Sequence, residues 1–184
     1  MKATKLLLIL LSCMLVVGCK KNNTEDEPTS PTTQKQQYPV ITMDTLKQYF
    51  PYQMGDRPIF QESDGYFGIT YTVNEVTFAS KDNKIIASIF MEGIMSAYNQ
   101  QYKVHIAAEV TDQHLLKTTF SLTRSGQSQQ TEGSFEYDTA KDGALPDQFN
   151  YSNGAIVEKD KGLTHYIEEE FASEWDWSHT YYNQ

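Results

Sequence analysis

Apolar and polar residues alternate with a period of two along most of the chain beyond residue 56. The clearest run places Phe67, Ile69, Tyr71 and Val73 at alternate positions. Such alternation gives a strand one buried face and one solvated face, as in antiparallel sheets. Strands are therefore predicted at eight places: 57–61, 66–79, 85–95, 101–111, 115–124, 131–137, 149–158 and 163–168.

Short turn signals separate these strands. Asp64-Gly65 is a two-residue hairpin signal between the first two strands, and Ser125-Gly126 and Asp160-Lys161-Gly162 mark later reversals of the chain. Consecutive hairpins favour an all-β fold, an antiparallel meander of about eight strands that forms a small, partly open barrel. A two-sheet β-sandwich is the alternative, because it fits the same strand count and turn spacing.

Two segments depart from simple alternation. Residues 43–50 carry apolar side chains at helical spacing, with Thr42 as a plausible cap and Pro51 as a stop, so one short N-terminal helix is predicted there. Strand 85–95 has apolar residues, including Phe90, on both of its faces. We therefore expect this strand to be covered on both sides, with the helix as one cover.

The N-terminus has a different composition from the rest of the chain. Lys2 and Lys5 precede an apolar stretch that is shorter than the roughly 18–20 residues of a membrane-spanning helix. This pattern predicts a secretory signal peptide over residues 1–18. The run Val16-Val17-Gly18-Cys19 resembles the bacterial lipobox, in which cleavage precedes a lipid-modified cysteine. The resemblance implies that Cys19 carries a lipid and anchors the mature chain to a membrane.

Residues 20–37 contain no aliphatic or aromatic side chain. Such a segment cannot bury enough apolar surface to offset the entropy lost on ordering. We therefore expect residues 19–37 to form the lipidated cysteine and a disordered tether, and residues 38–184 to form a single β-rich domain. The charged residues of the tether resemble the export signals of Bacteroidota surface lipoproteins, with a merely solvated linker as the alternative.

Two further short motifs carry a second resemblance. Tyr49-Phe50-Pro51-Tyr52, followed by glycines and a Thr/Tyr-rich strand, and Lys161-Gly162-Leu163 ahead of Trp175, resemble small uncharacterised Bacteroidota lipoproteins. The resemblance implies a β-rich domain of the bacterial envelope without known chemistry. It places the protein at the outer membrane and leaves open whether it faces the periplasm or the cell surface.

Composition excludes several classes of function. The chain is 39% hydrophobic and 12% aromatic, which is too much for a disordered protein, and its net charge of −9 argues against a nucleic-acid partner. Under the lipobox interpretation Cys13 leaves with the signal peptide and Cys19 is lipidated, so no thiol remains for catalysis. The histidines are too far apart in sequence for a local two-histidine motif, and we expect no metal and no cofactor. They are His105, His114, His165 and His179.

Catalytic motifs are not evident either. The segment Gly126-Gln127-Ser128 lacks the second glycine of a nucleophile elbow, and Glu168-Glu169-Glu170 is interpreted as a solvated strand edge. We therefore expect a protein that is not an enzyme, a membrane-anchored binding or accessory module. A small β-barrel that carries an apolar ligand is the first alternative, and a hydrolase of envelope or glycan polymers is the second.

An aromatic cluster near the C-terminus is the candidate binding site. It comprises Trp175, Trp177, Tyr181 and Tyr182. Trp and Tyr rings stack on sugars and supply contact area in protein interfaces, so a glycan or a protein is the expected partner. The alternative is that these rings close one end of the β core.

Overall fold

The computed structural model describes residues 37–127, 130–168 and 173–182. The predicted signal peptide at 1–18, Cys19 and the predicted tether up to residue 36 lie outside the described residues. These predictions are therefore not tested by the fold.

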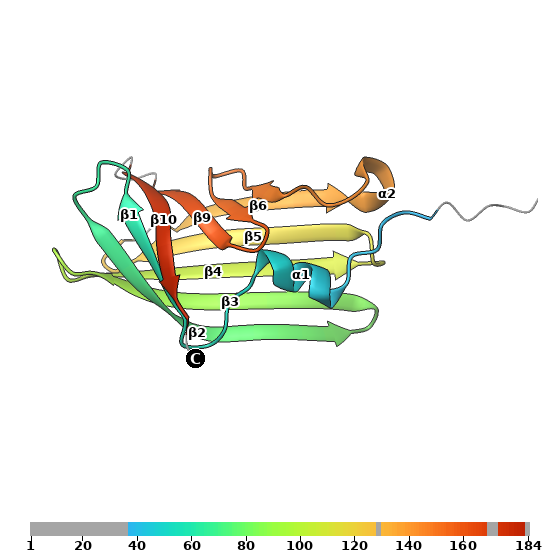
Figure 1. Cartoon of the computed structure of the whole chain (residues 1–184), viewed down its shortest axis with the longest axis horizontal. Helices are drawn as coiled ribbons and strands as arrows, with labels where there is room; N and C mark the ends of the chain where they lie inside the picture. The colour runs from blue at the N-terminus through green and yellow to red at the C-terminus, as the bar shows by residue number, and fades with distance from the viewer. Residues whose placement is uncertain (1–36, 128–129, 169–172, 183–184) are drawn as a thin grey trace, which may run out of the picture. The chain divides into compact units, whose positions relative to one another are not determined.

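The described residues form ten strands and two short helices (Figure 1). In chain order they are α1 (Met43–Tyr49), β1 (Arg57–Glu62), β2 (Gly68–Lys81), β3 (Lys84–Met95), β4 (Gln100–Thr111), β5 (Leu115–Arg124), β6 (Thr131–Asp138), α2 (Thr139–Asp142), β7 (Gln148–Asn150), β8 (Ile156–Glu158), β9 (Gly162–Glu168) and β10 (Ser173–Tyr181). The strands make one antiparallel sheet in the order β6-β5-β4-β3-β2-β1-β10-β9-β8-β7.

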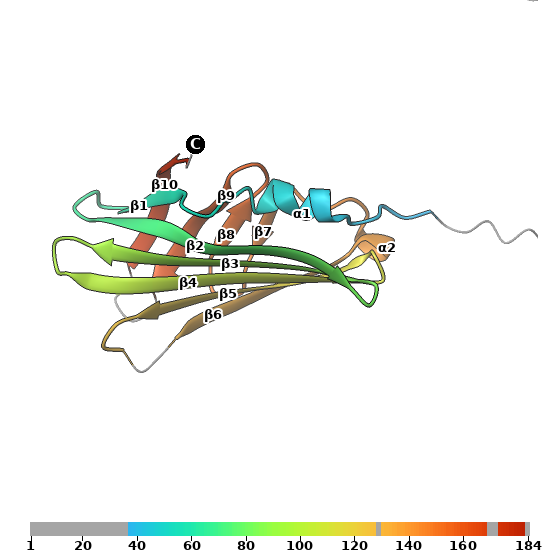
Figure 2. The ribbon, with the colours of Figure 1, turned by 90° about the horizontal axis from the view of Figure 1, so that it is seen from below.

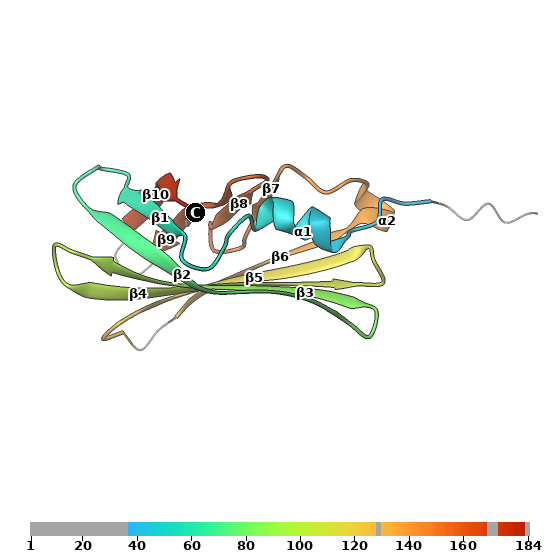
Figure 3. The ribbon, with the colours of Figure 1, turned by 60° about the horizontal axis from the view of Figure 1, so that its bottom comes forward.

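The sheet curls into a nearly closed barrel with one unsealed seam, between β6 and β7. The long strands β2–β6 run side by side, and β10–β7 fold over one face of them (Figures 2 and 3). At the seam the Ser152 amide donates to the Ser134 carbonyl (3.0 Å), and the Phe135 ring stacks on the Phe149 ring (4.9 Å between centroids). Because all strands belong to one sheet, the barrel prediction is confirmed and the sandwich alternative is excluded.

The predicted helix is confirmed and lies against the inner face of the long strands (Figure 3). Its capping box pairs Thr42 and Thr45, with the Thr45 amide 3.1 Å from the Thr42 hydroxyl; such caps contribute about 1 kcal/mol. Leu46 and Tyr49 are buried in the core. The helix ends one residue earlier than predicted, because Phe50 precedes a proline and proline disfavours the helical conformation in the residue before it.

Two predictions about strands and one about helices need correction. The described residues hold ten strands rather than about eight, because the predicted strand 149–158 is divided into β7 and β8 by a turn and because the C-terminal segment forms β10. In that turn the Gly154 amide donates to the Tyr151 carbonyl (3.0 Å), and Gly154 has a φ of 83° that favours glycine. A second helix, the four-residue α2, was also not predicted.

The expectation that strand 85–95 is covered on both faces is wrong. Ile89 and Met91 of β3 point into the core and are 0% exposed. On the outer face, Ile86 and Ile94 are 37% and 48% exposed, because α1 packs only on the inner side. The outer face of the long strands is therefore an accessible surface.

Candidate functional site

The outer face of the barrel over β1–β4 is polar because of strand alternation. Tyr71 of β2 points inward and is 0% exposed, so Thr70 and Thr72 on either side of it point outward. The strand register places Thr72 beside Glu92 of β3, and Glu92 beside Lys103 of β4. Polar side chains from three neighbouring strands thus share one patch of surface.

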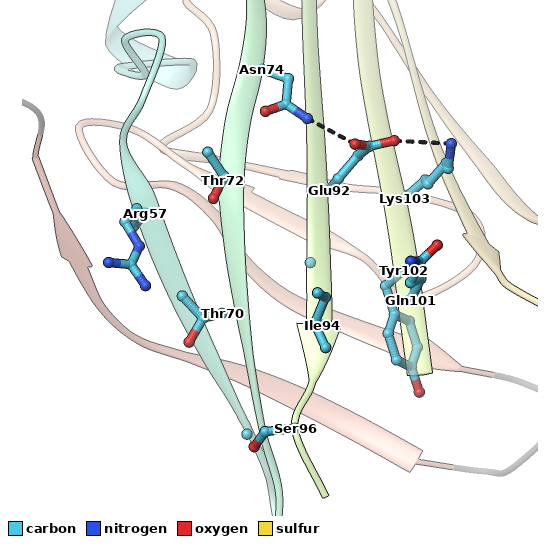
Figure 4. A pocket seen from close by; sticks show the side chains of 12 residues that line it. Arg57, Thr70, Thr72, Asn74, Glu92, Ile94, Ser96, Gln101, Tyr102 and Lys103 are labelled. Carbon is cyan, nitrogen blue, oxygen red and sulfur yellow. Dashed lines mark hydrogen bonds and ion pairs between the residues drawn. The ribbon is translucent and has the colours of Figure 1, made fainter. Parts of the chain in front are cut away.

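This patch is hollowed, and we call the hollow the outer groove (Figure 4). Its volume is about 550 Å³. The outward side chains that line it come from β1, β2, β3 and β4: Arg57, Thr70, Thr72, Asn74, Glu92, Ile94, Gln101 and Lys103. The groove therefore combines hydroxyl, amide, carboxylate and cationic groups with one apolar side chain.

Three of these side chains form a hydrogen-bonded row across β2, β3 and β4 (Figure 4). The Asn74 side-chain amide donates to Glu92 Oε2 at 3.1 Å, and Lys103 Nζ lies 2.9 Å from Glu92 Oε1. The Glu92 carboxylate is therefore held at both oxygens. Both charged side chains stay about half exposed, which leaves part of their hydrogen-bonding capacity open to a ligand.

The polar surface continues across β4–β6. A second hollow of about 290 Å³ shares Lys103 with the outer groove and is also lined by Ser88 and His105, whose Oγ and Nε2 atoms are 2.9 Å apart. A third hollow of about 390 Å³ shares His105 and Ser121 with the second. The three hollows together extend across six neighbouring strands, and neighbouring strands of a sheet lie about 4.8 Å apart. A surface of this extent suits an extended ligand.

Aromatic rings lie at one end of the outer groove. Gly68, which follows the β1–β2 turn, and Ser96, which begins the β3–β4 turn, line that end. Phe67 and Tyr98 of these turns are in ring contact, with 5.2 Å between centroids. Tyr98 is 64% exposed and Tyr66 is 80% exposed. Two exposed aromatic rings thus lie in the turns next to this end of the groove.

Of the four predicted aromatic site residues, the two tryptophans point into the barrel. Trp175 is 1% exposed and packs against Tyr166, with 6.2 Å between ring centroids and 16° between ring planes. Trp177 is partly buried against the core, and its Nε1 donates to the Thr180 hydroxyl at 3.0 Å. The structure therefore makes Trp175 a core residue, and its ring faces are not open to a ligand.

The two tyrosines are exposed, Tyr181 by 59% and Tyr182 by 60%. Tyr181 lies opposite Arg57 in the register of β10 and β1, so it borders the outer groove on the side away from β2. The Tyr181 ring also makes a T-shaped contact with the His179 ring, at 4.8 Å between centroids. The structure thus brings one predicted site residue to the groove, and binding by either tyrosine stays a prediction.

The interpretation of Glu168 as part of a solvated edge is wrong. Glu168 is 3% exposed; its Oε1 lies 3.0 Å from Arg124 Nη1, and its Oε2 accepts a hydrogen bond from the Tyr102 hydroxyl at 3.4 Å. The physical reason is strand alternation, because Tyr166, two residues earlier on β9, also points inward. That alternation is the signal in the sequence, and the run of three glutamates obscures it.

A cluster on the outside of β9 and β10 involves Ser63, His165 and Asp176. The Ser63 hydroxyl donates to Asp176 at 2.9 Å, and His165 Nδ1 lies 2.8 Å from the same carboxylate. The hydrogen bond with His165 is the main reason why the pKa of Asp176 is lowered from its usual value. In a Ser-His-Asp catalytic site the imidazole lies between the hydroxyl and the carboxylate. Here the carboxylate lies in the middle, so the arrangement does not activate the serine.

In the part of the chain that the structure describes, no three His, Cys, Asp or Glu side chains are grouped so as to hold a metal ion. No helix within the same residues has the length and apolar content to cross a membrane. Comparisons with models of known protein families, with curated proteins and with solved structures found no match. The resemblance to small envelope lipoproteins therefore stays a prediction.

Proposed function

We propose that this chain is a lipid-anchored envelope protein that binds a glycan chain along its outer groove without catalysing a reaction on it. The observation that supports this most strongly is the row of Asn74, Glu92 and Lys103, held by contacts of 3.1 and 2.9 Å in a hollow of about 550 Å³. Sugar hydroxyls both donate and accept hydrogen bonds, so fixed amide, carboxylate and ammonium groups suit them.

The chemistry of the groove favours a glycan over a protein as the ligand. The core of a protein–protein interface is depleted of charged residues and enriched in aromatic ones. The outer groove instead carries the Glu92–Lys103 ion pair at one end, with Thr72 and Gln101 close by. The exposed aromatic rings lie beside the groove: Tyr98 is in the turn that follows Ser96, and Tyr181 is opposite Arg57. Such rings can stack on the sugar rings of a bound glycan.

An apolar ligand inside the barrel is supported less well, because large side chains occupy the interior. Tyr71, Tyr102, Tyr166 and Phe120 are each 0% exposed. The hydroxyl groups of Tyr71 and Tyr166 lie 2.8 Å apart within the core. A barrel that carries an apolar ligand needs space for it in the interior, and here these rings occupy that space.

A hydrolase of glycan polymers is also supported less well. Glycosidases of the common type place two carboxyl groups on either side of the scissile bond. Among the described residues that line the outer groove, Glu92 is the one carboxylate, and Lys103 and Asn74 hold both of its oxygens. The groove thus offers hydrogen bonds to a ligand rather than an acid and a base.

The proposed anchor is the lipid on Cys19, after removal of residues 1–18. Its support is the lipobox resemblance of Val16-Val17-Gly18-Cys19. Each buried CH₂ of an acyl chain contributes about 0.8 kcal/mol to membrane binding, and stable anchoring takes more than one chain. Loss of membrane attachment in a Cys19→Ser variant, with the chain left unprocessed or released, is the expected result.

Binding of oligosaccharides to the purified full-length protein in detergent tests the proposed function. Thr72 lines the outer groove, and Thr72→Trp places a large ring in it. Thr77 is exposed on the same strand but does not line the outer groove, so Thr77→Trp is the matched control. We expect Thr72→Trp to weaken binding by about tenfold or more, roughly 1.4 kcal/mol, and Thr77→Trp to stay close to wild type. Equal effects of the two variants, or binding of proteins only, would contradict the proposal.

A further inference from the structure

Arg57 differs from the other charged residues of the outer groove in having no partner. It is exposed at the start of β1 and lines the groove. Its guanidinium group makes no hydrogen bond or ion pair with any of the described residues. The Glu92 carboxylate, by contrast, is matched by Lys103. The side chains that line the groove therefore carry one positive charge that nothing in the groove balances.

This local charge is opposite in sign to that of the protein as a whole. The chain has 24 acidic residues against 15 Lys and Arg, a net charge of −9. An anionic ligand is repelled by a surface of that sign, so it binds where a cation is accessible and not already paired. Among the residues that line the groove, Arg57 is the accessible cation that is not already paired.

We propose that Arg57 binds an oxyanion on a sugar ring, a carboxylate or a sulfate, so that the outer groove prefers acidic glycans. This rests on the proposed glycan-binding function of the groove. A guanidinium group presents parallel N–H donors that match a carboxylate or sulfate in a bidentate pair, which a lysine cannot reproduce. The hydroxyl groups of Thr70 and Thr72 in the same groove, and the exposed Tyr181 ring opposite Arg57, complete the surroundings of the acidic sugar.

The specificity follows from the same arrangement. A neutral glycan uses the hydrogen-bonding row of Asn74, Glu92 and Lys103, whereas an acidic glycan also pairs with Arg57. Removing the guanidinium group should therefore affect acidic glycans more than neutral ones. Lysine at the same position keeps the charge and loses the bidentate geometry, so it should restore only part of the preference.

The test uses a panel of hexasaccharides of several linkages, each in a neutral, a carboxylated and a sulfated form, titrated into the purified full-length protein. The wild type should bind a carboxylated or a sulfated form about tenfold more tightly than its neutral counterpart. In Arg57→Gln this ratio should fall to near one, and in Arg57→Lys it should be intermediate. Lys159→Gln, an exposed position between β8 and β9, removes the same charge away from the groove and should keep the wild-type ratio.

The outcomes separate this inference from the proposed function. If the wild type does not distinguish acidic from neutral forms, or Arg57→Gln keeps the preference, the role of Arg57 is overturned while sensitivity to Thr72→Trp upholds the groove as a glycan site. If no member of the panel binds, both proposals fail. The form that binds more tightly, carboxylated or sulfated, identifies the oxyanion.

Discussion

Tyr181 lies directly opposite Arg57 in the pairing of β10 with β1. This pairing brings the C-terminal segment of the chain to the edge of a groove whose other walls are β1–β4. The same strand carries Tyr181 outward and Trp175 inward, because the pairing of β10 with β1 shifts register between Trp177 and His179. Two aromatic residues of one strand therefore face opposite sides of the sheet.

Replacing Tyr181 should weaken glycan binding without unfolding the protein. Tyr181→Ala removes an exposed ring that borders the groove, and we expect a loss of about fivefold to thirtyfold in affinity, roughly 1–2 kcal/mol. Tyr182 has almost the same exposure but follows the end of β10, so Tyr182→Ala should have a smaller effect. Titration with the hexasaccharide of the panel that binds most tightly measures the affinity of both variants. A larger loss of affinity in Tyr182→Ala than in Tyr181→Ala would contradict the placement of Tyr181 at the edge of the groove.

Replacing Trp175 should instead destabilise the fold. Trp175→Ala empties a core position that is 1% exposed, which typically costs about 3–5 kcal/mol. Tyr66→Ala truncates a ring that is 80% exposed and should change the free energy of unfolding by less than about 0.5 kcal/mol. Urea unfolding followed by circular dichroism measures both variants. A Trp175→Ala protein of wild-type stability would show that the ring is not part of the core.

The ion pair of Arg124 and Glu168 should be far more sensitive to mutation than an exposed pair. Glu168→Gln removes one charge of a pair whose side chains are 19% and 4% exposed, and we expect a loss of about 3 kcal/mol because a largely buried ion pair is broken. Lys117 and Glu136 form an exposed pair of similar length, 2.9 Å, so Glu136→Gln should cost under about 1 kcal/mol. Thermal unfolding of the two variants compares them; equal losses would contradict the buried character of Glu168.

Stability should fall steeply in alkali because burial raises the pKa of several tyrosines above the usual value of 10.0. The affected residues include Tyr52, Tyr71, Tyr151 and Tyr166. Each has a higher pKa in the folded state than in the unfolded state, so its stabilising contribution is complete below pH 10 and is lost as the pH rises further. Four such groups lower the free energy of unfolding by about 5 kcal/mol per pH unit well above pH 10.

Tyrosinate absorbance in the near-ultraviolet, recorded together with circular dichroism during an alkaline titration, checks this prediction. The buried tyrosines should ionise in the same step in which the β signal is lost. Ionisation of all twelve tyrosines before any loss of β structure would contradict their burial.

Local features of the fold could be predicted from the sequence because short-range physics decides them. The alternation around Ile69 and Tyr71 marks β2, and the Thr42 cap together with Pro51 delimits α1 within one residue. The division of 149–158 was also visible in principle, in Asn153-Gly154, a dipeptide that favours a turn. The residues on either side of this dipeptide alternate as a strand does, and this pattern hides the turn.

The position of β10 could not be predicted, because it depends on pairing between distant segments. Alternation of Trp175, Asp176 and Trp177 indicates an extended segment with two faces, but not that β1 and β9 enclose it. Which face of β10 is buried depends on its place in the curved sheet. For this reason the sequence suggested a surface role for a tryptophan that lies in the core.

The groove could not be predicted for a related reason. Thr72, Glu92 and Lys103 each occupy an outward position, and in sequence each looks like any solvated residue of an antiparallel strand. Their grouping results from the register of three strands and from the curvature of the sheet. No local motif carries that information, and the unpaired state of Arg57 is likewise a property of the fold.

Chemical-shift mapping by NMR tests the central claim most directly, because it locates a bound glycan on the protein without any mutation. The isotope-labelled protein is titrated with the hexasaccharide that binds most tightly. The account predicts that the largest shift changes occur at the backbone amides of four residues, one on each strand that forms the outer groove: Arg57, Thr72, Glu92 and Lys103. Changes confined to other surfaces or to the barrel interior, with these four amides unmoved, would contradict it.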